Sequence, residues 1–175
     1  MARFETALAF VFEREGGFSD DPDDRGGTTK YGITQATYDE WRKLQNKPTE
    51  RVAALTRDTA AVVYYSLFWL RGRCDRLPVP VDALHFDACV NHGVLNAGRM
   101  LQQALSMAAA DVDGVVGPKT IGTALAANPI LTFGRYMRQR MALWLVLAGS
   151  NPKQMKFLTG WLHRAGFCLT KLLVA

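Results

Sequence analysis

Cysteine and long apolar stretches are both scarce in this chain of 175 residues. Its three cysteines, Cys74, Cys89 and Cys168, are widely spaced and form no Cys-x-x-Cys pair, which argues against a disulfide framework and favours buried free thiols. The longest apolar run, residues 141–149, is about half of the roughly 20 residues that a membrane-spanning helix requires. No apolar secretion core precedes Glu13. We therefore expect neither a transmembrane helix nor an export signal.

Acidic residues are missing from the C-terminal part of the chain. No Asp or Glu follows Asp113, whereas eight Lys and Arg residues do. Residues 1–50 have the opposite balance, with ten Asp and Glu against seven Lys and Arg. The overall composition, 49% hydrophobic and 21% charged, is typical of a globular protein. An acidic first part is thus joined to a basic second part, which suggests an anionic partner for the second part.

Helical periodicity dominates the rest of the sequence. Phe4, Leu8 and Val11 lie on one face of a helix predicted over residues 3–15. Residues 18–33 are dense in Asp, Gly, Pro and Thr and predict a long loop with a short β-hairpin. Further helices are predicted at residues 35–46, 57–71, 80–92, 94–109, 118–127, 129–148 and 151–170. The sequence therefore predicts an all-α fold with a small irregular, hairpin-containing region near the N-terminus.

Glu15 falls on the apolar face of the first predicted helix, at its C-terminal end. Burial and the negative end of the helix dipole both disfavour a carboxylate, so we expect the pKa of Glu15 to be raised. Cleavage of a glycosidic bond needs such a protonated acid, because the leaving oxygen must receive a proton. A surface Glu at a helix end gives the same pattern, and the acidic loop after it also suits a solvated loop or a calcium site.

The loop contains, in order, Glu15-Gly-Gly-Phe, Asp24-Arg-Gly-Gly-Thr-Thr29 and Tyr31-Gly-Ile-Thr34. Together these segments resemble the N-terminal signature of glycoside hydrolase family 108. That family consists of phage and prophage endolysins that hydrolyse peptidoglycan as N-acetylmuramidases. The spacing is also similar to that of phage lysozymes, from which this chain departs by carrying Lys30 in the slot of their Thr.

The second half contains Phe86-Asp87-Ala-Cys-Val-Asn91-His-Gly93, Leu101-Gln102-Gln-Ala-Leu105, Asp113-Gly-Val-Val-Gly117-Pro-Lys-Thr120 and Phe157-Leu-Thr-Gly160-Trp161-Leu-His-Arg164. These segments resemble the usual partner region of the family, a predicted peptidoglycan-binding segment. The two resemblances together span nearly the whole chain.

The resemblance implies a lysozyme-like helical fold and hydrolysis of the β-1,4 bond between N-acetylmuramic acid and N-acetylglucosamine. It implies a catalytic lobe at residues 1–75 and a peptidoglycan-binding lobe at residues 76–175, packed as one globular, monomeric unit. Glu15 is then the catalytic acid, Asp24 stabilises the transition state or activates water, and Thr29 positions that water. The candidate sugar-contacting residues are Thr28, Tyr31, Trp69, Asn91 and Gln102. Tyr31 or Trp69 can instead belong to the core, and for the motifs of the second half a structural role is favoured over sugar contact.

No cofactor, metal or nucleic acid is expected. His85, Cys89 and His92 recur at helical spacing with Asp82 one turn earlier, a pattern able to bind zinc. A half-buried helix face produces the same spacing, and the resembled family needs no metal. The aromatic residues among the C-terminal Lys and Arg are expected to pack inside the protein, with the cations free to meet an anionic cell envelope.

Two rival functions stay open. A lytic transglycosylase would cleave the same polymer with one Glu and form an anhydro product without consuming water. A non-enzymatic protein that binds the wall or membrane would explain the charge but not the Glu15 loop. For the endolysin, we expect synthesis in the host cytoplasm and action on the wall after the membrane is permeabilised.

Overall fold

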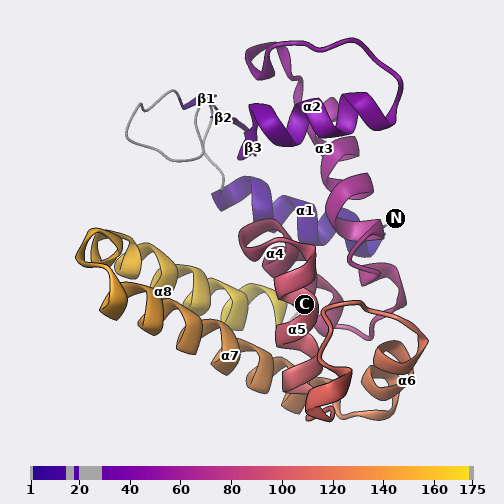
Figure 1. Ribbon diagram of the computed structural model, residues 1–175, viewed down its shortest axis with the longest axis vertical. Helices are drawn as coiled ribbons and strands as arrows, with labels where there is room; N and C mark the ends of the chain where they lie inside the picture. The colour runs from indigo at the N-terminus through magenta and orange to yellow at the C-terminus, as the bar shows by residue number, and fades with distance from the viewer. Residues whose placement is uncertain (1, 15–17, 20–28, 174–175) are drawn as a thin grey trace. The chain divides into compact units, whose positions relative to one another are not determined.

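The computed structural model describes residues 2–14, 18–19 and 29–173 (Figure 1). Most of these residues are helical, as predicted, and the strands among them belong to one small sheet. The chain forms two compact units, of which residues 1–70 are the first and residues 71–175 the second. Among the described residues, no helix combines the length and the apolar character needed to cross a membrane.

The first unit begins with helix α1, Ala2–Arg14, whose apolar face is buried as the spacing predicts. Val11 is fully buried, and Phe4 and Leu8 are nearly so. The ring of Phe4 meets that of Trp69 edge-on, with the two centroids 5.5 Å apart. The hydrophobic effect on this face therefore fixes α1 against the last turns of its own unit.

A three-stranded antiparallel sheet follows α1. Its strands are β1, Phe18–Ser19, β2, Thr29–Lys30, and β3, Ile33–Thr34. Tyr31 and Gly32 form the turn between β2 and β3, with φ of 53° and 74°. A two-residue turn with both φ values positive matches the twist of the strands it joins, which explains the glycine. The predicted short hairpin is thus confirmed.

Two more helices complete the first unit. They are α2, Gln35–Leu44, and α3, Arg57–Tyr64, and α3 runs on into π-helical turns at Tyr65–Leu70. Each begins at a threonine, Thr34 or Thr56, whose hydroxyl accepts a hydrogen bond from the backbone N–H three residues later. Such caps satisfy donors that the first turn of a helix leaves without partners.

The second unit is built on a helix that is buried on nearly all sides, α4, Val81–His92. The other helices are α5, Val94–Ala104, α6, Pro118–Ala126, α7, Pro129–Ser150, and α8, Leu158–Phe167, which continues into π-helical turns at Cys168–Leu172. Short 3₁₀ turns lie at Cys74–Arg76 and Pro152–Phe157. Helices α7 and α8 run side by side (Figure 1).

Helix α5 ends earlier than predicted, at Ala104 instead of residue 109. Ser106 takes the left-handed conformation, with φ of 56°, and its N–H donates to the carbonyl of Gln103. The N–H of Met107 then donates to the carbonyl of Gln102. This pair of hydrogen bonds is the Schellman closure of a helix, which usually carries a glycine at the left-handed position. A serine there gives no such signal in the sequence.

The backbone of the loop after α5 returns to touch that helix. A Cβ atom on Gly98 would lie only 2.0 Å from the carbonyl oxygen of Gly114. Gly114 itself has φ of 90°, a conformation that other residues rarely adopt. Glycine at both positions therefore permits the close approach of the two backbones.

Asp87 of α4 is the centre of a buried ion cluster. One carboxylate oxygen lies 2.7 Å from Arg140 of α7, and the other lies 2.7 Å from Arg164 of α8. Asp87 and Arg140 are fully buried. Burial alone would raise the pKa of Asp87, but the two guanidinium groups outweigh it and lower that pKa. Two of the eight C-terminal cations that suggested an anionic partner therefore neutralise the protein's own carboxylate.

Candidate functional site

The predicted catalytic residues follow α1 in the sequence, and the structure describes only one of them. Glu15, Asp24 and Thr28 are outside the described residues. Thr29 is described, lies on β2 opposite Thr34 of β3, and is half-buried. Of the proposed catalytic group, the structure therefore shows the position of Thr29.

The hairpin that carries Thr29 is anchored to three other elements of the first unit. The hydroxyl of Tyr64 in α3 donates to the carbonyl of Tyr31 at 2.8 Å. The ring of Tyr31 lies edge-on to that of Phe12 of α1, with centroids 6.1 Å apart. Lys30 donates through Nζ to the carbonyl of Ala53 at 2.6 Å. These contacts hold the end of α1 and the hairpin together, which fixes the two sides of the intervening loop.

Two of the predicted sugar-contacting residues lie in the first unit, in different environments. Tyr31 is half-buried at the hairpin turn, so part of its ring faces solvent. Trp69 is only 3% exposed, and its ring packs against Phe4. We therefore assign Trp69 to the hydrophobic core, the alternative to sugar contact that the sequence left open.

Two more of the predicted sugar-contacting residues, Asn91 and Gln102, lie in the second unit. Asn91 is exposed near the end of α4, and its Nδ2 donates to the carbonyl of Asp87 at 2.7 Å. Gln102 is 1% exposed, accepts from the N–H of Gly114 at 2.8 Å and donates to Asp113 at 2.7 Å. Its amide supplies the partners that a returning loop needs, so Gln102 is structural and not a surface contact. The burial of Gln102 favours the structural alternative that the sequence left open for this motif.

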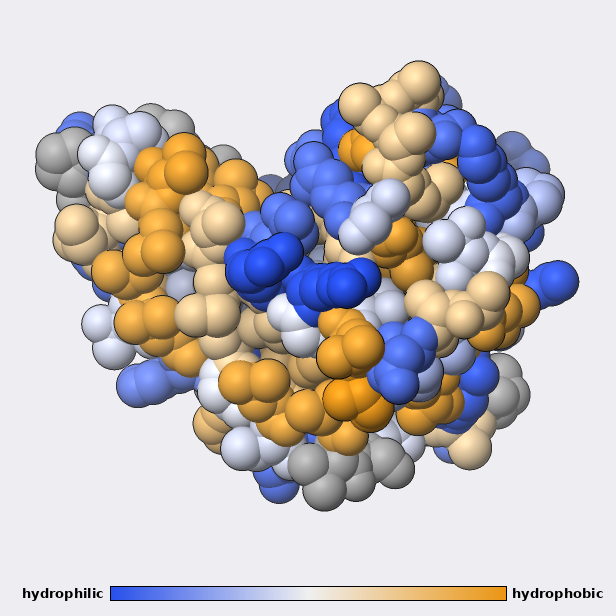
Figure 2. Space-filling model, turned by 90° about the horizontal axis from the view of Figure 1, so that it is seen from below, coloured by the Kyte–Doolittle hydropathy of each residue, from blue (hydrophilic) through white to orange (hydrophobic). Residues whose placement is uncertain are grey.

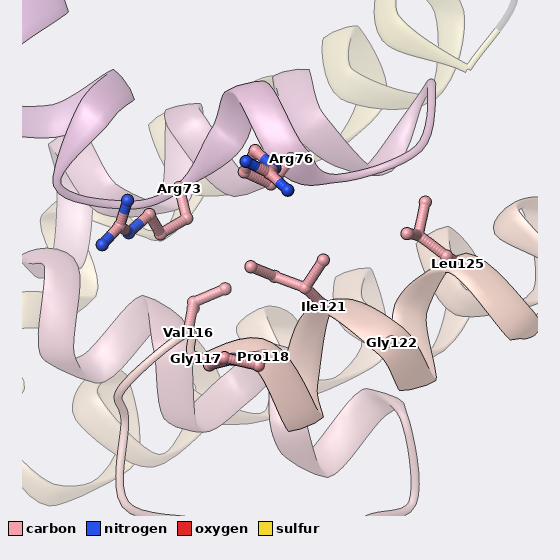
Figure 3. Close-up of a pocket in the computed structure, with 8 residues that line it drawn as sticks. All are labelled: Arg73, Arg76, Val116, Gly117, Pro118, Ile121, Gly122 and Leu125. Atoms are coloured by element: carbon pink, nitrogen blue, oxygen red, sulfur yellow. The ribbon is translucent and has the colours of Figure 1, made fainter.

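An open pocket of about 380 Å³ lies in the second unit (Figure 3). Its lining residues come from the segment before α4 and from the start of α6: Arg73, Arg76, Val116, Gly117, Pro118, Ile121, Gly122 and Leu125. Figure 3 shows the two arginines on one side, with Val116, Ile121 and Leu125 on the other.

The chemistry of this pocket suits an anion attached to an aliphatic group. Arg73 and Arg76 are exposed, and neither side chain has a hydrogen bond or ion pair among the contacts of the described residues. Guanidinium groups bind carboxylates in a planar, two-point geometry, and the opposite wall is apolar. Arg73 also has a left-handed backbone, with φ of 56°, a strain that clusters at functional sites.

The residues that can hold a metal differ from the set that helical spacing indicated. Cys74, His85 and Cys89 place their ligand atoms within 4.8 Å of one another. His92 instead lies beside Trp144, with ring centroids 6.1 Å apart. The helical spacing therefore indicated two of the three residues and missed Cys74, which comes from a separate 3₁₀ turn.

The surface of the second unit is mixed and does not form a purely basic stripe. Figure 2 shows one face of the protein on which hydrophobic residues gather over broad areas, with strongly hydrophilic residues between them. Leu145 and Val146 of α7 and Leu162 of α8 are exposed to 60%, 65% and 46%. Trp144 is buried and stacks on Trp161, as expected for packing aromatics.

Comparison with known proteins connects both units to one family. The profile of the Glycosyl hydrolase 108 family matches residues 8–93, and that of the Predicted Peptidoglycan domain matches residues 96–166. A solved structure, that of SagA from Brucella abortus, is similar over 99% of this chain and 95% of its own, with 30% sequence identity and a TM-score of 0.84. The chain belongs to the glycosyl hydrolase 108 family. No curated protein matches it.

Membership of family 108 confirms the resemblance and the all-α, lysozyme-like fold class. The two matches together support a glycoside hydrolase that acts on peptidoglycan, with peptidoglycan also the partner of the second matched region. They divide the chain near residue 95, whereas the compact units divide after residue 70. The family-108 match therefore extends into the second unit and includes Asp87 and both pocket arginines.

Sequence reasoning missed the pocket because its two walls are about 40 residues apart in the chain. The signal available was the basic cluster Arg71-Gly-Arg73-Cys-Asp-Arg76. Its cations were not connected with the Gly117-Pro118 helix start, because nothing in a single sequence pairs the two segments.

Proposed function

We propose that the protein is an N-acetylmuramidase that hydrolyses the β-1,4 bond between N-acetylmuramic acid and N-acetylglucosamine. The observation that carries this proposal is the match to family 108 over residues 8–93, which includes the whole Glu15-to-Thr34 signature. The lytic transglycosylase is the alternative on the same polymer.

In this proposal Glu15 donates its proton to the leaving glycosidic oxygen as the bond to the anomeric carbon breaks. Asp24 stabilises the positive charge that develops on the sugar or activates the attacking water, and Thr29 orients that water. One water is consumed, with its hydroxyl on the anomeric carbon and its proton restoring Glu15. Tyr31 and Thr28 remain the proposed sugar contacts of this loop.

The second region holds the wall in this proposal. The pocket of Arg73 and Arg76 receives a carboxylate of a peptide stem, and exposed cations such as Lys153 and Lys156 add weaker attraction. We propose a division of labour between a cutting part, residues 1–75, and a holding part, residues 76–175, within a monomer; the pocket takes Arg73 from the end of the first part and its other lining residues from the second.

The catalytic assignment is tested with Glu15→Gln. The amide is nearly isosteric but has no proton to donate, and general acid catalysis contributes roughly 10²–10⁴-fold. We expect lysis of purified walls to fall by at least a hundredfold, to the order of that contribution, with an unchanged circular dichroism spectrum. Glu13→Gln, an exposed position on α1, is the matched control and keeps full activity. A Glu15→Gln protein that keeps more than about a tenth of the activity contradicts the assignment.

Mass spectrometry of the digest identifies the bond and the reaction. Hydrolysis by a muramidase leaves a reducing N-acetylmuramic acid end that carries the added water. An anhydro end, lighter by one water, identifies the transglycosylase and overturns the hydrolytic step while leaving Glu15 as the acid.

For the cellular site of action, we propose that the protein reaches the wall once the membrane is permeabilised. Expression in a bacterial host is expected to cause lysis only when a membrane permeabiliser is supplied as well. Lysis from expression alone contradicts this route without affecting the assignment of the enzyme.

A further inference from the structure

Three buried side chains of the second unit face one another although the proposed wall chemistry uses none of them. Cys74 comes from the 3₁₀ turn Cys74–Arg76, and His85 and Cys89 lie one turn apart on α4. All three have no exposed surface. Their ligand atoms lie within 4.8 Å of one another, and Sγ of Cys89 is 3.6 Å from Nε2 of His85.

The hydrogen bonds around His85 determine whether its Nε2 carries a proton or a lone pair. The hydroxyl of Tyr136 donates its single proton to the carbonyl of Ala97 at 2.9 Å. The 2.8 Å contact between that hydroxyl and Nδ1 of His85 therefore requires the ring nitrogen to be the donor. A neutral His85 then has its proton on Nδ1 and a lone pair on Nε2.

That lone pair would face further lone pairs. The carbonyl oxygen of Gly72 lies 3.0 Å from Nε2 of His85, and a carbonyl can only accept. The sulfur atoms of Cys89 and Cys74 are on the same side. Nε2 of His85, the two sulfur atoms and the carbonyl oxygen of Gly72 beside Nε2 are all atoms that can bind a metal ion, and without a metal the thiol of Cys89 can donate to Nε2.

The distance between Cys89 and His85 matches that between two ligands of a tetrahedral zinc site. Bond lengths of about 2.3 Å to sulfur and about 2.0 Å to nitrogen place the two ligand atoms about 3.5 Å apart at a tetrahedral angle, close to the observed 3.6 Å between Cys89 and His85. The Nδ1–H of His85 is already held by Tyr136, as the second nitrogen of a metal-binding histidine normally is.

The charges are also consistent with a divalent cation. Two cysteine thiolates bound to the ion would balance its two positive charges, and thiolate with imidazole ligands favours zinc over magnesium or calcium.

We propose that Cys74, His85 and Cys89 bind one zinc ion, with the carbonyl oxygen of Gly72 as the fourth donor. The site joins the turn before α4 to α4 itself. Since Cys74 stands between Arg73 and Arg76, the ion fixes the turn that presents both arginines to the pocket. The role is structural and does not depend on the muramidase proposal.

Metal content of the full chain tests the proposal directly. The protein is purified from zinc-supplemented cells, dialysed against buffer and analysed by inductively coupled plasma mass spectrometry. We expect about one zinc per chain, as a closed site of this kind retains its ion. Stripping the metal with a chelator and adding Co²⁺ is expected to give the visible bands of tetrahedral cobalt and a near-ultraviolet thiolate-to-cobalt band.

Variants separate this site from adventitious binding. Cys89→Ser and His85→Gln are each expected to reduce zinc affinity by more than about tenfold and to remove or weaken the thiolate-to-cobalt band. Cys168→Ser is the matched control, because Cys168 is an equally buried thiol outside the trio, and it keeps the metal. Because the cobalt spectrum is recorded on the unmodified protein, the test stands even if a variant fails to fold.

A wild-type protein without zinc that also gives no thiolate-to-cobalt band overturns the proposal. Zinc that is retained in Cys89→Ser but lost in Cys168→Ser also overturns it.

Discussion

At Asp87, a fully buried carboxylate forms ion pairs with two arginines that come from different helices. Replacing it by asparagine leaves Arg140 charged, buried and without its partner. Breaking a buried pair in this way typically costs about 3–5 kcal/mol. We expect Asp87→Asn to lower the free energy of unfolding by about that amount, as measured by urea denaturation.

The matched control is Asp111→Asn. Asp111 also accepts from a cation, Lys119 at 2.6 Å, but that lysine is 70% exposed. Exposed pairs contribute roughly 0–1 kcal/mol, so this variant is expected to unfold at nearly the wild-type urea concentration. Equal effects of the two substitutions would contradict the structural role of Asp87.

His92 makes the free energy of unfolding of the second unit depend on pH. Burial, with the positive charge of Arg140, lowers its pKa from about 6.5 to about 4. Between these values the unfolded chain binds a proton that the folded chain does not, so the free energy of unfolding falls as the pH is lowered. We expect the wild type to lose about 2 kcal/mol more than His92→Gln between about pH 7 and 4.5.

Urea denaturation at the two pH values measures this difference, and His163→Gln is the control because His163 is exposed on α8. A wild-type protein and a His92→Gln variant with parallel pH profiles would show that His92 does not drive the acid sensitivity.

The role of some single residues cannot be predicted from one sequence. For Gln102 the sequence left a structural role and a sugar contact open, and the structure shows the residue buried with its amide bound to the returning loop. The sequence alone could not show this, because the partner Gly114 is twelve residues away and approaches only through the tertiary fold. Glu15 differs from Gln102, because its interpretation depends on the spacing of nearby residues and on family membership and not on a distant contact.

At the level of elements, the contact between α5 and the loop after it depends on glycine. Since a Cβ on Gly98 would lie 2.0 Å from a backbone oxygen, the two segments must separate in Gly98→Ala. We expect that variant to lose roughly 1–3 kcal/mol of unfolding free energy, the usual cost of overpacking, in urea denaturation. Gly160→Ala in α8 meets nothing within 4 Å and is expected to gain about 0.5–1 kcal/mol from its helix position.

If both alanine variants proved equally stable, the close approach of Gly98 and Gly114 would not be part of the folded state in solution.

Most elements could be predicted because their signals are local. The stripe of α1, the threonine caps and the prolines at the start of α6 and α7 act within one or two turns. The exceptions have non-local or weak signals. The end of α5 uses a left-handed Ser106, and the predicted helix over residues 151–170 begins instead as a 3₁₀ turn and becomes α8 at Leu158.

For the whole molecule, wall attachment is expected to depend on a specific pocket more than on total charge. Arg73→Ala combined with Arg76→Ala removes two donors that face an apolar wall. Since hydrogen bonds to charged groups contribute about 1.5–3 kcal/mol each, we expect binding to purified walls to weaken by at least tenfold in a pelleting assay. Cleavage of a short soluble glycan is expected to stay unchanged.

Lys153→Ala combined with Lys156→Ala is the matched control, because it removes the same charge from exposed positions outside the pocket. This lysine double variant is expected to weaken wall binding less than the arginine double variant does. Its effect on binding is expected to disappear as the salt concentration rises, since exposed charges are screened over about 8 Å. If the two double variants weaken binding equally at every salt concentration, wall attachment follows net charge and the pocket has no special role.

The ion cluster at Asp87 also bears on how this chain can be recombined with others. Asp87 belongs to the stretch matched as a glycosyl hydrolase, while both of its arginines belong to the stretch matched as a peptidoglycan domain. A chimera joined near residue 95 would separate the carboxylate of Asp87 from its two arginines. The residues that pack against α4 would then come from the other parent protein. A cassette that starts at residue 71 carries all three charges with it. The transferable piece of this protein is therefore the compact unit, and its borders differ from those drawn by sequence similarity.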